Sequence, residues 1–282
     1  MSASDKVWLI TGCSQGLGRV LAETVIAQGG TVAVTARNPV TLDALLASAP
    51  ERVLPLALDV NDEAAAQSSV AAVLARFGRI DVLVNNAGYG LAGAVEEVSS
   101  AEARAQMETN LFGALNMTRA VLPAMRAARA GHLLQISSVA GQAATPGLGL
   151  YNASKFALEG FSEALALELA PLGIRVTIIE PGPFRTAWAG ASLATATTRI
   201  ADYEATAGQT RKLLADVAGK QPGDPARAAL AMIAVVNAEK PPLRLPLGAM
   251  AVNRIRGKLA AQAAELEAWQ ALALGADFPA GV

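Results

Sequence analysis

Tyr151 and Lys155 stand four residues apart in the segment Tyr-Asn-Ala-Ser-Lys. In a helix this spacing places both side chains on one face, one turn apart. An ammonium group beside a phenol stabilises the phenolate, so it lowers a tyrosine pKa from about 10 toward neutral pH. Tyr151 would then be able to donate or accept a proton during a reaction. The alternative is a half-exposed helix on which the two side chains do nothing together.

Strand and helix patterns alternate around this pair. Short apolar runs predict strands over residues 7–11, 31–36, 53–58, 81–84, 132–137, 174–180 and 243–247. Helical patterns cover residues 19–28, 39–47, 62–76, 101–129, 150–170 and 224–238. We expect Asn61 to be the N-cap of the third helix and the long fourth helix to break near Asn110. This βαβ rhythm predicts a parallel sheet covered by helices on both faces.

The remaining segments follow no such rhythm. Residues 186–219 contain helical patches and no strand pattern, and residues 249–272 predict a final amphipathic helix. Since no linker or repeat divides the chain, we expect residues 1–282 to form a single domain.

A glycine-rich turn joins the first strand to the first helix. Gly12, Gly16 and Gly18 lie there, spaced G-x-x-x-G-x-G rather than in the usual dinucleotide pattern G-x-G-x-x-G. Without a Cβ, this turn lets backbone N–H groups approach a pyrophosphate at the helix N-terminus. A purely structural turn is the alternative.

The same residues also spell G-x-S-x-G, which is typical of the nucleophile elbow of α/β-hydrolases. An esterase with Ser14 as nucleophile needs a histidine further along the chain as its base. His132 is the only histidine, and its place at the start of a strand predicts a surface residue. The hydrolase alternative is therefore disfavoured.

The end of the second strand bears on the choice of cofactor. Dinucleotide sites usually carry an acid there, bonded to the ribose 2′-OH. Here Ala36 is followed by Arg37, and a guanidinium is a good partner for a 2′-phosphate. Arg37 thus favours NADP over NAD, with a solvated surface arginine as the alternative.

Composition excludes several classes of protein. A net charge of −1 predicts no nucleic-acid partner. Charges interrupt most of the chain, and the charge-free residues 137–154 contain glycines and Pro146, which argues against a membrane span. The first residues run into a strand without a signal peptide. One cysteine excludes an internal disulfide and a cysteine-based metal cage. We expect a cytoplasmic protein without a metal site or a membrane partner.

Five motifs occur in an order that one family shares. They are Thr11-Gly12-x-x-x-Gly16-x-Gly18, Asn85-Asn86-Ala87-Gly88, Ser137-Ser138, Tyr151-x-x-x-Lys155 and Pro181-Gly182-Pro183-Phe184-Arg185-Thr186. From Val7 to about Leu247 the chain therefore resembles the short-chain dehydrogenases/reductases. The resemblance implies an α/β, doubly wound Rossmann fold with a mostly parallel seven-stranded sheet, a helical substrate lid and a C-terminal helix. The core would be residues 6–185, and the lid residues 186–220.

The resemblance also implies roles for the motif residues. Tyr151 would be the general acid/base, Ser138 would bind the substrate oxygen, and Ser137 would point to the other side of the strand. Lys155 would lower the tyrosine pKa and hold the nicotinamide ribose. Asn110 would kink its helix and hold a water that relays protons to Lys155.

Further residues are expected to bind the cofactor. Asp59 and Val60 would meet the adenine, and Thr186 with the backbone near Phe184 would meet the carboxamide. The other implied cofactor-binding positions are Gly12, Ser14, Gly16, Leu17, Gly18, Arg37, Asn86, Ala87, Gly88, Pro181 and Gly182.

The implied reaction is hydride transfer between NADP(H) and a ketone or secondary alcohol. Residues 89–95, 139–150 and 186–209 would choose the substrate, and their small or apolar side chains predict a mid-sized, uncharged, largely apolar molecule. These side chains are Leu91, Ala143, Ala144, Leu148, Trp188 and Leu193. Alternatively, they only pack the lid. A weaker resemblance points to retinol- and hydroxysteroid-type enzymes.

Two questions of class and assembly stay open. A nucleotide-sensing protein of the same fold is possible without catalysis, although the intact Ser138, Tyr151 and Lys155 argue against it. The family commonly pairs through its long helices, so the resemblance implies a homodimer or homotetramer. Phe156 and Phe161 would either line such an interface or belong to the core.

Overall fold

The computed structural model describes residues 5–190 and 192–278, and seven strands form its central sheet. They are β1 (Val7–Ile10), β2 (Thr31–Ala36), β3 (Val53–Ala57), β4 (Val82–Asn85), β6 (Gly131–Ile136), β7 (Ile174–Pro181) and β9 (Arg244–Leu247). Their order is β3-β2-β1-β4-β6-β7-β9, and each neighbouring pair is parallel. The strand order reverses between β1 and β4, which is where such sheets open a crevice at their carboxyl edge.

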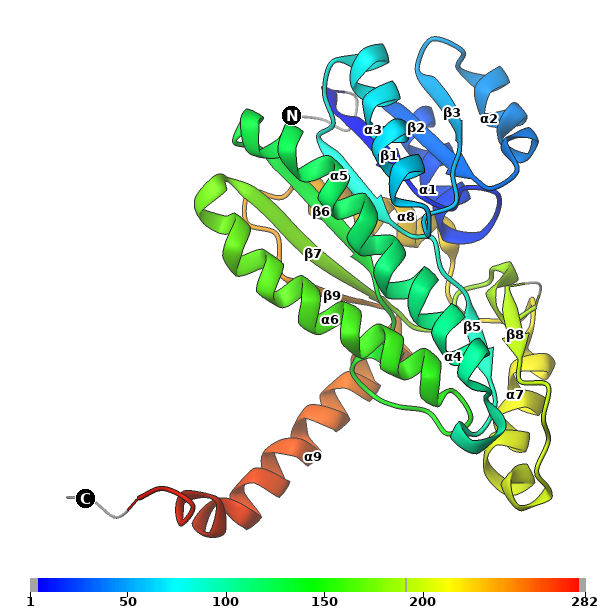
Figure 1. The fold of residues 1–282 in the computed structure, drawn as a ribbon, viewed down its shortest axis with the longest axis vertical. Coiled ribbons are helices and arrows are strands. Elements are labelled where there is room, and N and C mark those ends of the chain that lie inside the picture. The colour runs from blue at the N-terminus through cyan, green and yellow to red at the C-terminus, as the bar shows by residue number, and fades with distance from the viewer. Residues whose placement is uncertain (1–4, 191, 279–282) are drawn as a thin grey trace.

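Helices cover both faces of the sheet (Figure 1). The longer ones are α1 (Gly16–Ala27), α3 (Glu63–Phe77), α5 (Gly113–Ala128), α6 (Gly149–Leu169) and α8 (Pro225–Asn237), and α2 (Asp43–Ser48) is short. On β1, Trp8 and Ile10 face the core under α1 and α8, whereas Leu9 faces the core under α3, α5 and α6. Both faces of this strand are therefore buried, as its continuous apolar run predicts.

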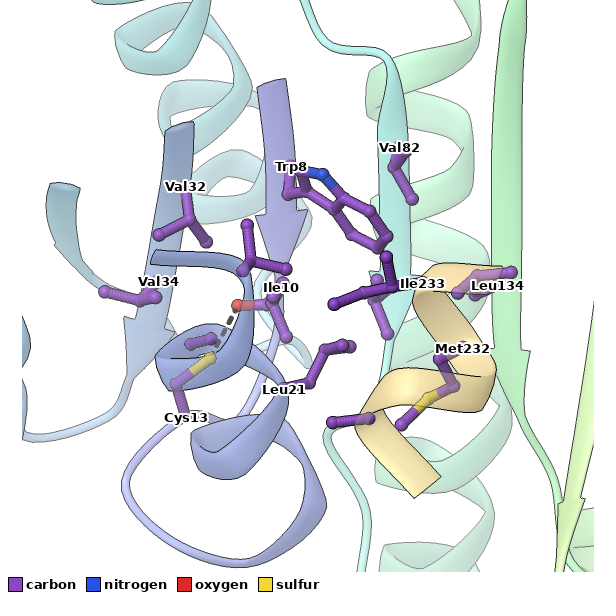
Figure 2. Close-up of a cluster of buried hydrophobic side chains, with 14 of the residues drawn as sticks. Trp8, Ile10, Cys13, Leu21, Val32, Val34, Val82, Leu134, Met232 and Ile233 are labelled. Carbon is purple, nitrogen blue, oxygen red and sulfur yellow. Dashed lines mark hydrogen bonds between the residues drawn. The ribbon is translucent and has the colours of Figure 1, made fainter. Parts of the chain in front are cut away.

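The core under α1 and α8 is shown in Figure 2. Trp8, Leu21 and Met232 are almost completely buried there. Full burial of such a side chain contributes about 1.5–3 kcal/mol to folding, so this packing fixes where α1 begins relative to β1. That junction holds the glycine-rich turn.

The long fourth helix is interrupted, as predicted. It consists of α4 (Ser100–Met107), a π-helix over Glu108–Phe112 and α5. Asn110 lies in the π-helix, so the extra residue in this turn marks the predicted break.

Two predictions of local secondary structure are wrong. Asp62, not Asn61, caps α3: its Oδ1 accepts a bond from the Ala65 N–H at 2.9 Å. The segment over residues 186–219 does contain a strand, β8 (Leu193–Thr195), which pairs with β5 (Gly90–Ala92). Three residues are too few to show a strand pattern, and the partner lies about a hundred residues away.

Much of the rest of the lid segment is helical. It includes short turns at Ala187–Ala189, Ala201–Tyr203 and Glu204–Gly208, followed by α7 (Gln209–Val217). Residue 191 of the predicted lid lies outside the described residues, as do the first four residues of the chain.

The final helix, α9 (Ala249–Leu274), begins where it is predicted but is not packed along its length. Only Ala251 and Ile255 are buried, and the helix extends away from the body of the molecule (Figure 1). Among the described residues, no helix is both long enough and apolar enough to cross a membrane.

His132 is buried, with 4% of its surface exposed, so the expectation of a surface histidine is wrong. Its Nε2 lies 2.9 Å from the Thr177 hydroxyl on β7, a partner that the position of His132 in the sequence does not reveal. Burial, with a smaller contribution from Arg175, lowers the pKa of the ring from 6.5 to about 4.

This shift predicts acid sensitivity. As the pH falls below 6.5, His132 gains a proton in the unfolded chain but stays neutral in the folded chain until about pH 4. Protonation therefore favours unfolding, and by pH 4 this residue alone lowers the free energy of unfolding by about 3 kcal/mol. Urea unfolding of the wild type and of His132→Gln at pH 7.5, 6, 5 and 4 measures the effect. The variant should lose less stability across this range. Parallel curves for the two proteins would contradict the assignment.

Candidate active site

A cavity of about 980 Å³ opens at the carboxyl edge of the sheet. Its walls come from the glycine-rich turn, from the residues that end β2, β3, β4, β6 and β7, and from the lid segment. The predicted site residues that line it are Gly12, Ser14, Gly16, Leu17, Arg37, Asp59, Val60, Asn86, Ala87, Gly88, Ser138, Tyr151, Lys155, Pro181, Gly182, Phe184 and Thr186. Gly18 and Asn110 do not line the cavity. They contact residues that do: Gly18 packs against Gly12 and Asn86, and Asn110 bonds to Tyr89.

Tyr151 and Lys155 lie in the first two turns of α6 and are 5% and 6% exposed. The Lys155 ammonium donates to the Ile136 carbonyl at the end of β6 at 2.8 Å. It lies 5.9 Å from the centroid of the Tyr151 ring. The Tyr151 ring also contacts Trp188, with ring centroids 5.2 Å apart. Two buried polar groups are thus fixed on one wall of the cavity.

Burial controls the proton affinity of both groups. It raises the pKa of Tyr151 to about 12, while a hydrogen bond with Ser138 acts in the opposite direction. It lowers the pKa of Lys155 to about 8, against the attraction of Glu159. The expected lowering of the Tyr151 pKa by Lys155 is therefore not seen, because desolvation by burial is the largest influence on this pKa. At neutral pH, Tyr151 carries its proton.

The two serines before Tyr151 differ in orientation, as predicted. The Ser138 hydroxyl lines the cavity and accepts from the Ala140 N–H at 3.1 Å. The Ser137 hydroxyl is buried close to Gly141 and Glu159, where a Cβ on Gly141 would come within 2.6 Å of it. Both serines belong to the cavity lining, but Ser137 is buried and Ser138 is half-exposed, so Ser138 is the more available to a bound molecule.

Asn110 fastens the loop after β4 to α6. Its Nδ2 donates to the Tyr89 carbonyl and to the Ser154 hydroxyl, each at 3.0 Å, and its Oδ1 accepts from the Tyr89 N–H at 3.0 Å. The side chain is 1% exposed. It therefore braces the wall that carries Gly88 and Lys155, and its expected water relay stays a prediction.

The glycine-rich turn is bonded to the loop after β4. The Asn86 amide donates to the carbonyls of Thr11 at 2.8 Å and Gly12 at 3.1 Å. The Thr11 hydroxyl accepts from the N–H groups of Asn86 and Ala87. Gly12 has a φ of +71° and Gly16 of +70°, a conformation that strains any other residue.

The N-terminus of α1 has the properties of an anion site. Its N-cap, Gln15, makes no side-chain bond to the first turn, and that turn contains no acid. The first N–H groups of the helix are therefore left for a partner, and the helix dipole favours a negative one. The glycines leave the space that a phosphate needs.

The outer end of the cavity holds Arg37 and Asp59. Arg37 is exposed immediately after β2 and lines the cavity, and its side chain makes no hydrogen bond or ion pair with any described residue. Asp59 is also exposed, and its Oδ1 accepts from the Asn61 N–H at 3.0 Å. Val60 beside it is buried.

The hydrolase alternative has no support in this geometry. Ser14 is exposed on the cavity wall, but His132 does not line the cavity, and its ring bonds to Thr177 between β6 and β7. Among the described residues, no group of His, Cys, Asp and Glu is placed to hold a metal ion.

A buried pair of carboxylates behind Lys155 was not predicted. Glu159 follows Lys155 by one helical turn and is 4% exposed, and Glu180 on β7 is 1% exposed. Gln142 donates to both at 3.0 Å, and Arg244 lies 3.0 Å from Glu159. Burial, and next the charge of Glu159, raise the pKa of Glu180 to about 7. The spacing of Lys155 and Glu159 was the one available signal.

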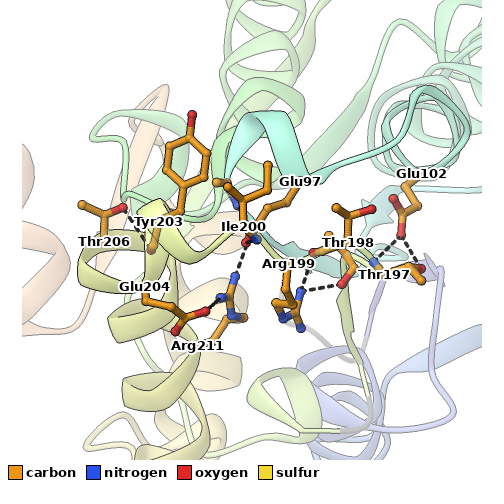
Figure 3. A network of polar contacts seen from close by, with 12 residues as sticks. Glu97, Glu102, Thr197, Thr198, Arg199, Ile200, Tyr203, Glu204, Thr206 and Arg211 are labelled. Carbon is orange, nitrogen blue, oxygen red and sulfur yellow. Dashed lines mark hydrogen bonds and ion pairs between the residues drawn. The ribbon is translucent and has the colours of Figure 1, made fainter.

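The lid segment is anchored by a third buried acid, Glu97 (Figure 3). It accepts from Arg211 at 2.7 Å and from the N–H groups of Ile200 and Ala94 at 3.0 and 2.8 Å. Although burial opposes it, these bonds hold the pKa of Glu97 below its usual value. An ionised Glu97 therefore holds two distant points of the lid against the body.

Comparison with known proteins identifies the family. Residues 6–196 match the family model for short chain dehydrogenases. The chain belongs to the short-chain dehydrogenases. It is therefore an oxidoreductase of the family that its motifs resemble.

Similar proteins extend over nearly the whole chain. Oxidoreductase BOA17 of Botryotinia fuckeliana is 40% identical over 270 residues, covering 95% of this chain and 98% of that protein. Human retinol dehydrogenase 8 is 38% identical over 264 residues, covering 86% and 82%. The crystal structure of a short-chain dehydrogenase from Streptomyces avermitilis has a TM-score of 0.91 and 44% identity, covering 96% of this chain and 100% of that one.

Two other members of the family were solved with different dinucleotides. A short chain dehydrogenase from Burkholderia cenocepacia contains NADP, with 27% identity, a TM-score of 0.75 and coverage of 95% and 98%. A 3-ketoacyl-(acyl-carrier-protein) reductase from Brucella melitensis contains NADH, with 26% identity, a TM-score of 0.73 and coverage of 87% and 98%.

The glycine turn of this short-chain dehydrogenase yields a stability prediction. A Cβ on Gly18 would lie 2.3 Å from Asn86 Nδ2 and 2.8 Å from the Gly12 carbonyl oxygen. Gly18→Ala should lower the free energy of unfolding by about 1–3 kcal/mol through overcrowding. Gly160, also helical, has nothing within 4 Å of its would-be Cβ, so Gly160→Ala should raise it by about 1 kcal/mol.

Chemical denaturation of the two alanine variants and the wild type measures both effects. A Gly18→Ala protein as stable as the Gly160→Ala protein would show that the contact with Asn86 is not restrictive.

Proposed function

We propose that this protein transfers a hydride between NADP(H) and a mid-sized, uncharged, largely apolar ketone or secondary alcohol. The observation that carries the proposal is the hydrogen-bonded pair Ser138 and Tyr151 on the cavity wall, with Lys155 fixed beside it. Two hydroxyl groups aimed at one point are what a carbonyl oxygen needs when it becomes an alkoxide.

The residues present fit a dinucleotide. The open N-terminus of α1 and the positive φ angles of Gly12 and Gly16, which glycine adopts without strain, suit its pyrophosphate. Asp59 and Val60 would meet the adenine, and residues 86–88 the ribose region. Tyr151 and Lys155 would hold the nicotinamide ribose, and Pro181, Gly182, Phe184 and Thr186 the carboxamide. When bound, the dinucleotide supplies or accepts the hydride, which no side chain can do.

The chain itself handles the proton. In the reducing direction, Ser138 and Tyr151 donate hydrogen bonds to the carbonyl oxygen, and Tyr151 transfers its proton to that oxygen as negative charge develops. Because burial keeps Tyr151 protonated at neutral pH, the donor is ready before the reaction. Lys155, held at the Ile136 carbonyl, stabilises the phenolate left behind.

The apolar part of the wall supports the proposed substrate class. Leu148, Trp188, Leu193 and Leu214 surround Tyr151 in one apolar cluster, and all line the cavity. Retinol dehydrogenase 8, a relative at 38% identity, is named for an apolar alcohol. We therefore prefer an enzyme with an apolar substrate to a sensor that only binds the dinucleotide.

The proposed assembly is a homodimer or homotetramer through the long helices. Phe156 on α6 and Phe112 before α5 are each 44% exposed, and such apolar side chains suit an interface. Phe161 instead packs in the core. The cytoplasmic location and the lack of nucleic-acid and membrane partners stay predictions.

Tyr151→Phe tests the proposed acid. Removing the hydroxyl should lower turnover by about 10²–10⁴-fold, because the proton donor is lost, while the dissociation constant for NADPH changes little. NADPH oxidation is followed with a panel of steroid-sized and long-chain ketones, together with phosphorylated ketones, which the apolar wall should reject.

Tyr203→Phe is the control, since its hydroxyl bonds to Glu96 outside the cavity. Tyr151→Phe activity within tenfold of this control would refute the assigned role. NADPH binding by the wild type without turnover of any ketone would instead favour a sensor.

Arg37→Ala tests the cofactor preference. Loss of a charge-assisted bond to the 2′-phosphate should weaken NADPH binding by about 10–100-fold and leave NADH binding nearly unchanged. Fluorescence titration of both cofactors measures the difference. Arg227→Ala, a substitution of an exposed arginine on α8, should change neither. An equal loss for NADPH and NADH would reject the preference for NADP.

A further inference from the structure

Most of α9 has no partner among the described residues of the chain. Its first turns are anchored: Ala251 and Ile255 pack against Val139, and Arg254 bonds to the Thr145 hydroxyl at 2.8 Å. From Leu259 to Leu274 every residue is exposed. Figure 1 shows this part of the helix projecting beyond the body of the molecule. Helices in proteins take most of their stability from packing against other elements, and this part of α9 receives none from the described body of the chain.

The exposed part of α9 is rich in large apolar side chains. Leu259, Leu266, Trp269 and Leu272 are 57%, 65%, 65% and 71% exposed. Folded monomers rarely leave such side chains together in solvent, and a group of them marks an interaction surface.

Their spacing is that of a coiled-coil seam. Val252, Leu259 and Leu266 follow one another at seven-residue intervals, and Trp269 stands three residues after Leu266. Positions of this kind lie on one side of a helix and insert between the side chains of a facing helix. Leu272 lies outside this seam.

The charges of α9 are divided between its two halves. Arg254, Arg256 and Lys258 lie near the body, whereas Glu265 and Glu267 lie in the far half. A parallel partner would place like charges together, whereas an antiparallel copy of the same helix brings the basic half of one helix beside the acidic half of the other. If the pair is centred between Gln262 and Ala263, Leu259 faces Leu266 and Lys258 faces Glu267.

We infer that α9 pairs antiparallel with α9 of a second copy of this chain, in a two-stranded coiled coil around a two-fold axis. The contact is isologous, so it closes as a dimer. The division of charge favours this partner over an anionic lipid surface, which attracts bases along the whole of a helix. Because Met250 and Arg254 also line the cavity, the coiled coil would rest directly on its rim.

A charge placed in the seam tests the pairing. In the full-length protein, Leu266→Glu should raise the dissociation constant of this contact at least tenfold, measured by sedimentation equilibrium. Leu272→Glu is the matched control, because it makes the same change on the same exposed helix outside the seam, and it should leave the assembly unchanged. If the protein also associates through a second interface, loss of the α9 contact in Leu266→Glu should halve the mass of the assembly.

Charge exchange and crosslinking test the orientation. Lys258→Glu should weaken the assembly, and Lys258→Glu combined with Glu267→Lys should restore it. Gln262→Cys, next to the axis, should form an intermolecular disulfide, whereas Val252→Cys should not. Cys13, the one native cysteine, is buried. Equal crosslinking at both positions would indicate a parallel pair and overturn the proposal.

Two further results would also overturn it. One is an equal loss of association in Leu266→Glu and Leu272→Glu. The other is a monomeric wild type that floats with phosphatidylserine-containing vesicles and loses this binding in Leu266→Glu, which would assign α9 to a lipid surface.

Discussion

The bond from the Lys155 ammonium to the Ile136 carbonyl is the contact on which the site depends. An ammonium group buried to this extent is costly unless polar partners face it, and here the carbonyl at the end of β6 lies 2.8 Å away. The charge of Glu159, one turn further along α6, also favours it. This contact fixes α6 against the carboxyl edge of the sheet. Tyr151, one turn earlier, is thereby held on the cavity wall.

Polar side chains fix the rest of the wall in the same way. Asn110 bonds the loop after β4 to α6, and Thr11 and Asn86 bond that loop to the glycine-rich turn. Each bond joins two segments far apart in the chain. The polar groups of the site are therefore held in place by bonds within the protein. Such groups need little rearrangement to stabilise the charge of a transition state. The segment over residues 186–220, held through Glu97, lines the other side of the cavity.

The sequence was sufficient to predict the sheet and the position of its motifs. Runs such as Val7–Ile10 are apolar without interruption because both faces of a parallel strand are buried. The carboxyl ends of parallel strands all lie at one edge of the sheet. The motifs that follow these strands therefore converge there: the glycine turn, Asn86, Ser138 and Tyr151. The break at Asn110 also followed from the family pattern.

What escaped prediction depends on contacts between distant segments. The burial of His132 depends on Thr177 of the neighbouring strand, and β8 exists only because β5 lies beside it. The pKa of Tyr151 is raised rather than lowered, because its desolvation comes from the packed site and not from its spacing to Lys155. Glu180 and Glu159 likewise meet only in the folded chain.

Isotope transfer tests the central claim most directly. NADPH carrying deuterium at both C4 positions is incubated with the protein and an apolar ketone, and the product is analysed by mass spectrometry. We expect an alcohol with one deuterium on the carbinol carbon, formed in equal amount to the oxidised cofactor. Cofactor binding without deuterated alcohol from any ketone would contradict the account.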